Sequence, residues 1–187
     1  MLQKKDIIFF RESTFKLVKL IFDSPNKSFH IRELAKKTGL STTAITGRHF
    51  LKDLERYGLI KVEKTDLATN IRANLESDAY SFYKKIFNLY FLERYGLIWT
   101  LKEVYKPEAI ILFGSFAKGE DTENSDIDIL IVTQRKAAGI GDFIKQFEKE
   151  VNRKVNLHFL ESVSSSTAEF KNALANGIVL HGYLKII

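Results

Sequence analysis

The sequence predicts an α+β protein with an N-terminal helix-turn-helix module, a helical connector and a C-terminal mixed α/β domain. Three observations predict this class. Helical spacing of apolar residues near the N-terminus gives way to two short extended runs, an aromatic-rich helical stretch follows, and strand-like apolar runs then alternate with helical ones. The expected segments are residues 1–75, 76–106 and 107–187.

The composition is that of a folded chain without disulfides. Its 187 residues are 45% hydrophobic and 28% charged, and the absence of cysteine excludes disulfide scaffolds, thiolate metal sites and cysteine nucleophiles. No apolar run approaches the ~18 residues that a membrane helix needs, and the charged start leads into only four apolar residues, 7–10. We expect a cytoplasmic protein with no membrane partner.

The N-terminal segment is predicted to contain three helices and a β-hairpin. The expected elements are a helix that ends at residues 24–26, an extended piece at 29–31, helices over 32–38 and 41–57, and extended runs over 59–64 and 71–75. Gly39 suits the position after a helix, Ser41 is a good N-cap, and Gly58 stops the third helix. This is the element order of a winged helix-turn-helix.

The positive charge is concentrated in this segment. The net charge is +6, and residues 1–75 hold 15 Lys and Arg against 8 acidic residues, a balance of +7. A basic module joined to a near-neutral remainder favours a polyanionic partner, with nucleic acid as the first expectation.

The third helix is the expected recognition helix, because the second helix of a helix-turn-helix enters the major groove. The candidate DNA-binding residues are Thr42, Thr43, Thr46, Arg48, His49 and Lys52 on this helix and Lys61, Lys64 and Arg72 in the hairpin. A solvated charged face and a protein-interaction module remain open as alternatives.

The connector carries aromatic residues at spacings of three and four, which predicts core or dimer helices rather than a platform for bases. A homodimer is therefore one expectation. A seven-residue segment, Leu54–Ile60, recurs letter for letter as Leu92–Ile98, but its surroundings do not repeat, so no solenoid is indicated.

The C-terminal segment alternates strands and helices, which predicts a mixed α/β domain. Strands are expected at residues 110–113, 127–132, 155–160 and 178–180, and helices at 115–119, 141–152 and 167–176.

Two features of this segment carry chemistry. Gly114 and Ser115 stand at a strand-to-helix junction, where backbone N–H groups favour a phosphate. Asp126 and Asp128 are two apart on a strand, so both side chains leave one face and could share a divalent cation such as Mg²⁺. Their order between two strands makes the combination far more specific than either pair alone.

This stretch resembles the signature of the minimal nucleotidyltransferases of the DNA polymerase β superfamily, which is Gly-Ser, about ten residues, then Asp-x-Asp. Gly114-Ser115, residues 117–120 (Ala-Lys-Gly-Glu) and residues 125–128 (Ser-Asp-Ile-Asp) match its elements. The resemblance covers residues 108–184. Similar archaeal families carry an ArsR-like winged helix in front, which fits residues 1–75.

The resemblance implies a transferase that depends on Mg²⁺ or Mn²⁺ and moves a nucleoside monophosphate from a nucleoside triphosphate to a hydroxyl group. The implied nucleotide-binding residues are Gly114, Ser115, Lys118 and Ser125. Asp126 and Asp128 are the implied catalytic metal ligands. The family has a third carboxylate on a later strand, and Asn156 stands at that catalytic position here. Asn156 cannot take a proton, and His158 on the same strand face is an alternative base.

Three functions remain open at this stage. The first is an enzyme that modifies a partner protein or a small molecule. The second is a DNA-binding transcriptional regulator whose degenerate C-terminal domain only binds nucleotide. The third is an antitoxin-like subunit that uses this domain to bind a partner protein.

Overall fold

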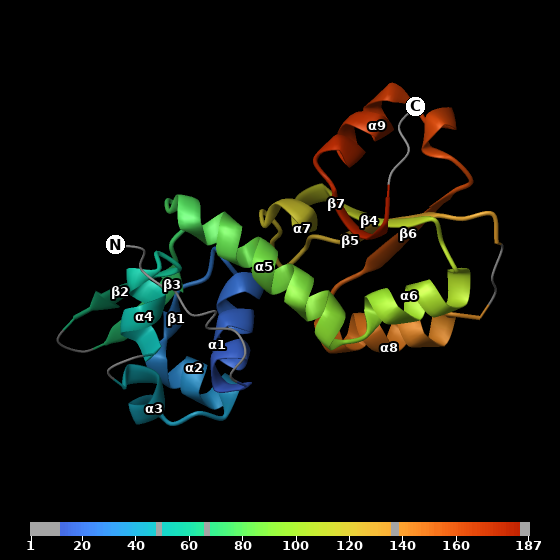
Figure 1. The fold of residues 1–187 in the computed structure, drawn as a ribbon. Helices are drawn as coiled ribbons and strands as arrows, with labels where there is room; N and C mark the ends of the chain where they lie inside the picture. Colours follow the sequence, from blue (N-terminus) through green and yellow to red (C-terminus); the bar gives the residue numbers. More distant parts are fainter. Residues whose placement is uncertain (1–11, 48–49, 66–67, 136–138, 184–187) are drawn as a thin grey trace, which may run out of the picture. The chain divides into compact units, whose positions relative to one another are not determined.

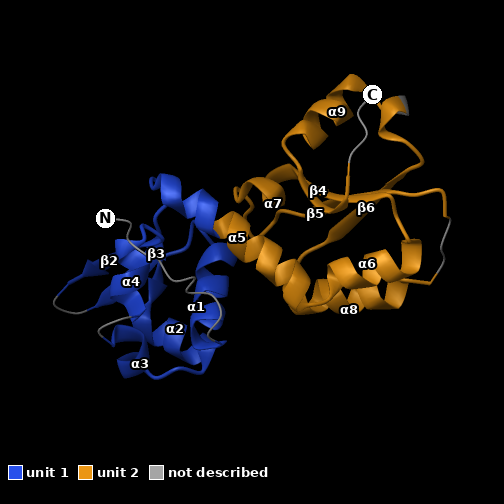
Figure 2. Cartoon of the chain, in the orientation of Figure 1, with its two compact units in different colours: residues 1–83 blue, residues 84–187 orange. Residues whose placement is uncertain are grey.

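The structure is a computed structural model that divides into two compact units, residues 1–83 and 84–187 (Figure 2). It describes residues 12–47, 50–65, 68–135 and 139–183. Helix α5 (Asp78–Arg94) begins in unit 1 and continues into unit 2. The two units differ from the three expected segments, residues 1–75, 76–106 and 107–187, and do not test them. The division into three segments therefore stays a prediction.

Unit 1 combines short helices with a three-stranded sheet (Figure 1). The elements are α1 (Glu12–Asp23), β1 (Phe29–His30), α2 (Ile31–Thr38), α3 (Thr42–Thr46), α4 (Phe50–Arg56), β2 (Ile60–Lys64) and β3 (Thr69–Ala73). The strands are antiparallel in the order β1-β3-β2, and Val62 lies opposite Ile71. The order of elements agrees with the expectation, while the winged-helix class itself stays a prediction.

Local sequence explains these elements. Phe15, Val18 and Phe22 share one face of α1 and are buried together because their spacing follows the helical period. Helix α2 begins where His30 Nδ1 accepts a hydrogen bond from the Arg32 N–H at 3.1 Å. It ends at Gly39, whose φ of +72° favours glycine.

The prediction of one helix over residues 41–57 is wrong for the described residues. Helix α3 ends at Thr46, because Gly47 leaves the helical region with ψ of 146°, and α4 begins at Phe50. Glycine is a poor helix former, so an extended residue at this position costs the chain little. Two of the candidate DNA contacts, Arg48 and His49, lie outside the described residues.

Unit 2 is built on a four-stranded mixed sheet in the order β6-β5-β4-β7 (Figure 1). Besides the rest of α5, its elements are α6 (Leu97–Tyr105), β4 (Ala109–Phe113), α7 (Gly114–Lys118), β5 (Ile127–Val132), α8 (Gly141–Val151), β6 (Val155–Leu160), η2 (Val163–Ser165), α9 (Ala168–Ala175) and β7 (Ile178–Gly182). Strand β4 pairs antiparallel with β5 and β7, and β5 pairs parallel with β6. The predicted strands at residues 127–132 and 155–160 are confirmed with the same bounds.

Helices cover both faces of this sheet, with α6 and α8 on one side and α9 on the other (Figure 1). Strand β4 is therefore buried along its whole length, and its five residues are all apolar. On the α9 side, Leu174 packs with Phe113 and Leu130 in one apolar cluster. None of the described helices combines the length and hydropathy that a membrane crossing requires.

Candidate active site

The candidate site lies where β4 ends and β5 begins. Phe113, the last residue of β4, lies opposite Asp128, the second residue of β5. The chain passes from Phe113 directly into α7 through Gly114 and Ser115. Because β4 and β5 are neighbouring strands, the Gly-Ser and Asp-x-Asp pairs meet at one end of the sheet, as the sequence predicts.

The third member of the site comes from β6. The parallel register places Asn156 beside Asp128. The Asn156 Nδ2 group donates hydrogen bonds to Asp126 Oδ2 at 3.1 Å and to Asp128 Oδ1 at 3.0 Å. Asp126 is exposed and Asp128 is half-buried. The structure thus brings together the three residues that were predicted to be catalytic.

The donor set of this cluster fits a divalent cation that shares its coordination with phosphate. Asp126 and Asp128 supply carboxylate oxygens, and Mg²⁺ is commonly held by one or two carboxylates together with substrate phosphates. Among the described residues, no group of three Asp, Glu, His or Cys side chains is placed to hold a metal alone. The Asn156 amide donates hydrogen bonds to both carboxylates. Its hydrogen atoms therefore occupy the position in which a cation would contact the two carboxylates.

Gly114 has a structural role that can be measured. Its φ is +74°, and a Cβ atom at this position would lie 2.7 Å from Asp128 Oδ2. No L-amino acid with a side chain fits there without moving the Asp128 carboxylate. Gly114 was predicted to allow close approach of a phosphate, and the structure shows in addition that it makes room for a carboxylate of the site.

The other predicted nucleotide-binding residues surround this point. Ser115 is half-buried in the first turn of α7, and Lys118 is exposed at its last residue. The Ser125 Oγ accepts a hydrogen bond from the Thr122 N–H at 2.9 Å, so this hydroxyl shapes the loop before Asp126. Contact of Ser115, Lys118 and Ser125 with nucleotide stays a prediction.

His158 lies next to the site on the same face of β6. Its Nε2 is 3.8 Å from Asp128 Oδ1, and its ring lies beside the rings of Phe113 and Phe170 at centroid distances of 5.2 and 6.1 Å. The Asn156 amide and the His158 ring thus approach the same oxygen, Asp128 Oδ1.

Sequence reasoning missed a buried polar cluster below this site. It consists of Lys84, Asn88, Asp121 and Arg153, each with 7% or less of its surface exposed. One signal existed in the sequence, because Lys84 and Asn88 are polar residues four apart within an aromatic-rich helix. Their partners are 28 to 37 residues away, which no local pattern shows.

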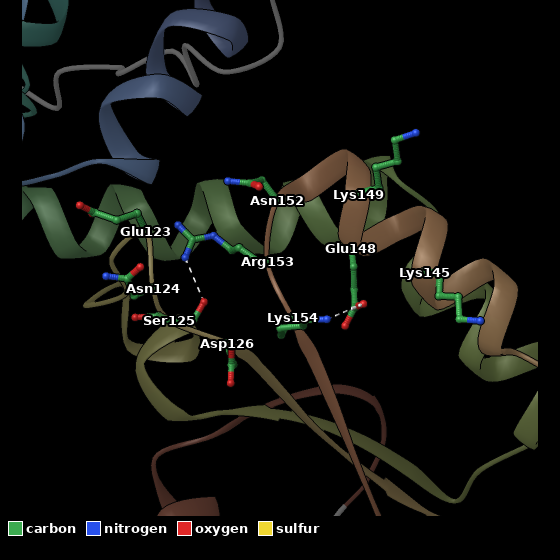
Figure 3. A pocket seen from close by; sticks show the side chains of 10 residues that line it. All are labelled: Glu123, Asn124, Ser125, Asp126, Lys145, Glu148, Lys149, Asn152, Arg153 and Lys154. Carbon is green, nitrogen blue, oxygen red and sulfur yellow. Dashed lines mark hydrogen bonds and ion pairs between the residues drawn. The ribbon is translucent and has the colours of Figure 1, made fainter.

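A hollow of about 450 Å³ opens beside Asp126 (Figure 3). Its lining consists of Glu123, Asn124, Ser125, Asp126, Lys145, Glu148, Lys149, Asn152, Arg153 and Lys154. Its lining includes both basic and acidic side chains, and Lys154 Nζ lies 3.7 Å from Glu148 Oε2. The mixed charge gives this hollow no clear preference for anions or cations.

The candidate DNA-binding residues of unit 1 fall into two groups. Thr42, Thr43, Thr46, Lys52 and Lys64 are exposed. Two hairpin cations are held by acids, because Lys61 Nζ lies 2.6 Å from Glu76 Oε2 and Arg72 Nε lies 2.8 Å from Glu63 Oε1. The hairpin cations are therefore partly neutralised. DNA contact by any of these residues stays a prediction.

The fold and the site of unit 2 agree with a known class of domain. Residues 96–183 match the family described as "Polymerase beta, Nucleotidyltransferase". The Gly-Ser pair at 114–115 and the carboxylates of Asp126 and Asp128 lie inside this match. Unit 2 therefore contains a nucleotidyltransferase-like domain.

Curated relatives of this domain come from Methanocaldococcus jannaschii. Over 50 residues the chain is 48% identical to "Putative protein adenylyltransferase MJ0128", a stretch that covers 27% of this chain and 47% of the relative. Over 50 residues it is 46% identical to "Putative protein adenylyltransferase MJ1215", covering 27% of this chain and 54% of that relative. The chain thus spans about half the length of these two relatives.

One similar solved structure is described as "Crystal structure of the toxin-antitoxin with AMP-PNP". The likeness has 24% sequence identity and a TM-score of 0.37, and it covers 48% of this chain and 73% of the other. A superposition this loose carries no argument about the fold or the partners of the chain.

Proposed function

We propose that unit 2 is a Mg²⁺-dependent nucleotidyltransferase that moves a nucleoside monophosphate from a nucleoside triphosphate to a hydroxyl group. The observation that carries this proposal is the convergence of Asp126, Asp128 and Asn156 at the strand end that leads into Gly114 and Ser115. The family match over residues 96–183 supports the same class of reaction.

Each residue has a role in this reaction. Asp126 and Asp128 hold the metal ion, while the Ser115 hydroxyl and nearby backbone N–H groups hold the terminal phosphates. When bound, Mg²⁺ neutralises charge on the phosphate oxygens. The oxygen of the acceptor hydroxyl attacks the α-phosphorus, the bond to the β-phosphate oxygen breaks, and pyrophosphate leaves. The proton of the hydroxyl passes to His158 or to water, because Asn156 takes no proton. Catalysis here depends on positioning and charge rather than on a covalent enzyme intermediate.

The names of the relatives support a choice of nucleotide and acceptor. Both M. jannaschii proteins are named protein adenylyltransferases, which supports ATP as donor and a protein hydroxyl as acceptor. A toxin-like protein and a second copy of this chain are the two partners to test first. Mn²⁺ has the same ligand preferences and is expected to replace Mg²⁺.

Asn156 sets an expected limit on the rate. An amide adds no negative charge and takes no proton, so the site has two carboxylates where three would bind cations more tightly. We therefore expect slow transfer by the unaltered protein. A domain that binds nucleotide and only signals its presence to unit 1 is the alternative function that this residue favours.

Calorimetric titration tests the proposal without knowledge of the acceptor. The purified protein is titrated with ATP, CTP, GTP and UTP, each with and without Mg²⁺, and Asp126→Ala is the control. We expect binding that requires Mg²⁺ and is lost in Asp126→Ala, with ATP the tightest of the four. Absence of binding for all four nucleotides would overturn the proposal.

A second proposal concerns DNA binding by unit 1. It is supported by the +7 balance of residues 1–75 and by the exposure of Thr42, Thr43 and Lys52 on α3 and α4. Binding that depends on phosphate contacts falls steeply with salt. We expect the affinity for duplex DNA to fall at least tenfold between 50 and 200 mM salt. Lys52→Gln should reduce this slope, whereas Lys171→Gln in unit 2 should not.

A further inference from the structure

A buried polar cluster lies beside the loop that connects α7 to β5. Lys84 Nζ and Arg153 Nη2 approach Asp121 Oδ2 to 3.3 and 3.1 Å, and Asn88 Nδ2 donates to Asp121 Oδ1 at 2.8 Å. Asp121 and Lys84 are each 1% exposed. Burying the charges of Lys84, Asp121 and Arg153 costs free energy unless their partners are well placed, so a role for this cluster is expected.

The two cations also hold main-chain carbonyl groups of the loop. Lys84 donates to the Asp121 carbonyl, and Arg153 donates to the carbonyls of Thr122 and Ser125, the latter at 3.2 Å (Figure 3). Asn88 donates to the carbonyl of Phe116 in α7 at 2.9 Å. The cluster therefore forms hydrogen bonds with main-chain carbonyl groups at both ends of the loop.

These contacts join the three elements that supply the candidate site. Phe116 follows Ser115 in α7, Ser125 directly precedes Asp126, and Arg153 comes three residues before Asn156. Lys84 and Asn88 lie one turn apart on α5 and so face the loop from one side of that helix. Each separate piece of the site is thus tied to the same four side chains.

We propose that Lys84, Asn88, Asp121 and Arg153 are positioning residues that fix the spacing between Ser115 and the carboxylates of Asp126 and Asp128. This inference rests on the proposed function of the site. The cluster does not contact nucleotide or metal itself. It acts through the loop, and a loss of its contacts lets the phosphate-binding and metal-binding parts move apart.

The electrostatics of the cluster agree with this role. Burial raises the pKa of the Asp121 carboxyl, while Lys84, Arg153 and Asn88 act in the opposite direction. The Arg153 guanidinium also lies over the Phe116 ring, with Cζ 5.7 Å from the ring centroid. Removal of Asp121, for example, takes a carboxylate from both cations and an acceptor from Asn88, so several contacts of the cluster are lost at once.

The test uses the full chain and three variants. Asn88→Ala removes the contacts to Phe116 and Asp121. Arg153→Lys is milder, because it keeps the charge and loses the planar group that reaches two carbonyls. Leu101→Ala is the control, because Leu101 is buried in α6 outside the cluster and its loss destabilises without touching the loop. All are measured where circular dichroism shows each one folded.

Two readouts are compared across these variants. The first is backbone amide hydrogen exchange of residues 115–126, which we expect to be at least tenfold faster in Asn88→Ala and Arg153→Lys than in Leu101→Ala. The second is Mg-ATP affinity, which we expect to fall at least tenfold in the two cluster variants and less than twofold in the control. Equal effects in the control, or no effect in the cluster variants, overturns the proposal.

The exchange readout separates this proposal from the proposed function. If the unaltered protein binds no Mg-ATP, the proposed function fails, and selective acceleration of exchange over residues 115–126 still supports the positioning role. If Mg-ATP binds and the cluster variants bind it normally, the proposed function stands and the positioning role fails.

Discussion

Unit 2 contains a buried carboxylate, Asp121, and a more accessible pair, Asp126 and Asp128, whose surroundings differ. Asp121 is 1% exposed and meets two cations and an amide. Five residues later, Asp126 is exposed and Asp128 is half-buried, and both accept hydrogen bonds from one neutral amide. Among the described residues, no Lys or Arg lies within ion-pair distance of either one.

The difference indicates that the charge of Asp121 stabilises the fold, whereas the charges of Asp126 and Asp128 remain accessible to a ligand. The partners of Asp121 use its charge to hold a loop, and burial makes that arrangement costly to disturb. Within the described part of the chain, no Lys or Arg forms an ion pair with Asp126 or Asp128, and Asp126 is exposed to solvent. A carboxylate pair of this kind favours a metal ion, whose charge would offset the repulsion between the carboxylates and a phosphate group.

The largest expected effect is on stability, from Asp121→Ala. We expect a loss of ~3–5 kcal/mol in the free energy of unfolding, because two buried cations lose the carboxylate of Asp121 as an ion-pair partner. Asp126→Ala should change it by less than ~0.5 kcal/mol, since the residue is exposed. Urea unfolding followed by circular dichroism measures both variants. Similar urea midpoints for Asp121→Ala and Asp126→Ala would show that the buried and the exposed carboxylate contribute equally to stability.

A second test sharpens the account of the exposed pair through glycine. Gly114→Ala meets a positive φ, at ~1–2 kcal/mol, and also a Cβ position 2.7 Å from Asp128 Oδ2. Gly39→Ala meets a similar φ of +72° with nothing within 4 Å. We expect comparable stability losses but a loss of Mg-ATP binding in Gly114→Ala alone, measured by calorimetry. Normal binding by Gly114→Ala would show that Asp128 is free to move.

The smallest expected effect is on the balance of charge at the open site. Asn156→Asp adds a third carboxylate and should lower stability without divalent ions by about 1 kcal/mol through repulsion. Mg²⁺ should restore this loss, and Asn172→Asp on exposed α9 should show no such Mg²⁺ response. Thermal unfolding with and without Mg²⁺ measures both, and transfer from ATP should accelerate in Asn156→Asp. A Mg²⁺ response equal to that of Asn172→Asp would argue against a metal between these strands.

Sequence reasoning succeeded where one short segment contains all the information. Residues 127–132 and 155–160 are rich in apolar residues, interrupted by Asp128, Asn156 and His158 and bounded by polar residues, and their bounds as strands were predicted correctly. The two-residue spacing of Asp126 and Asp128 placed them on one face for the same reason. The place of Asn156 beside this pair was predicted from the family resemblance, in which a third carboxylate stands on a later strand.

One repeated segment shows that local sequence alone does not determine which element follows the end of a helix. The segment Leu54–Ile60 and its copy Leu92–Ile98 both end a helix at a glycine with positive φ, Gly58 and Gly96. The first copy then enters β2 and the second begins α6, so the next element is decided by tertiary context. The buried cluster around Asp121 was missed for the same reason, since its members meet only after folding.

Helix α5, which both units share, bears on whether the nucleotidyltransferase-like domain can be moved into another protein. The family match starts at residue 96, yet Lys84 and Asn88, half of the group that grips the loop, lie on α5 before that point. A fragment cut at the family border would fold with a cation and an amide missing from its interior. Gene fusions and domain exchanges that use this chain should therefore keep α5 whole.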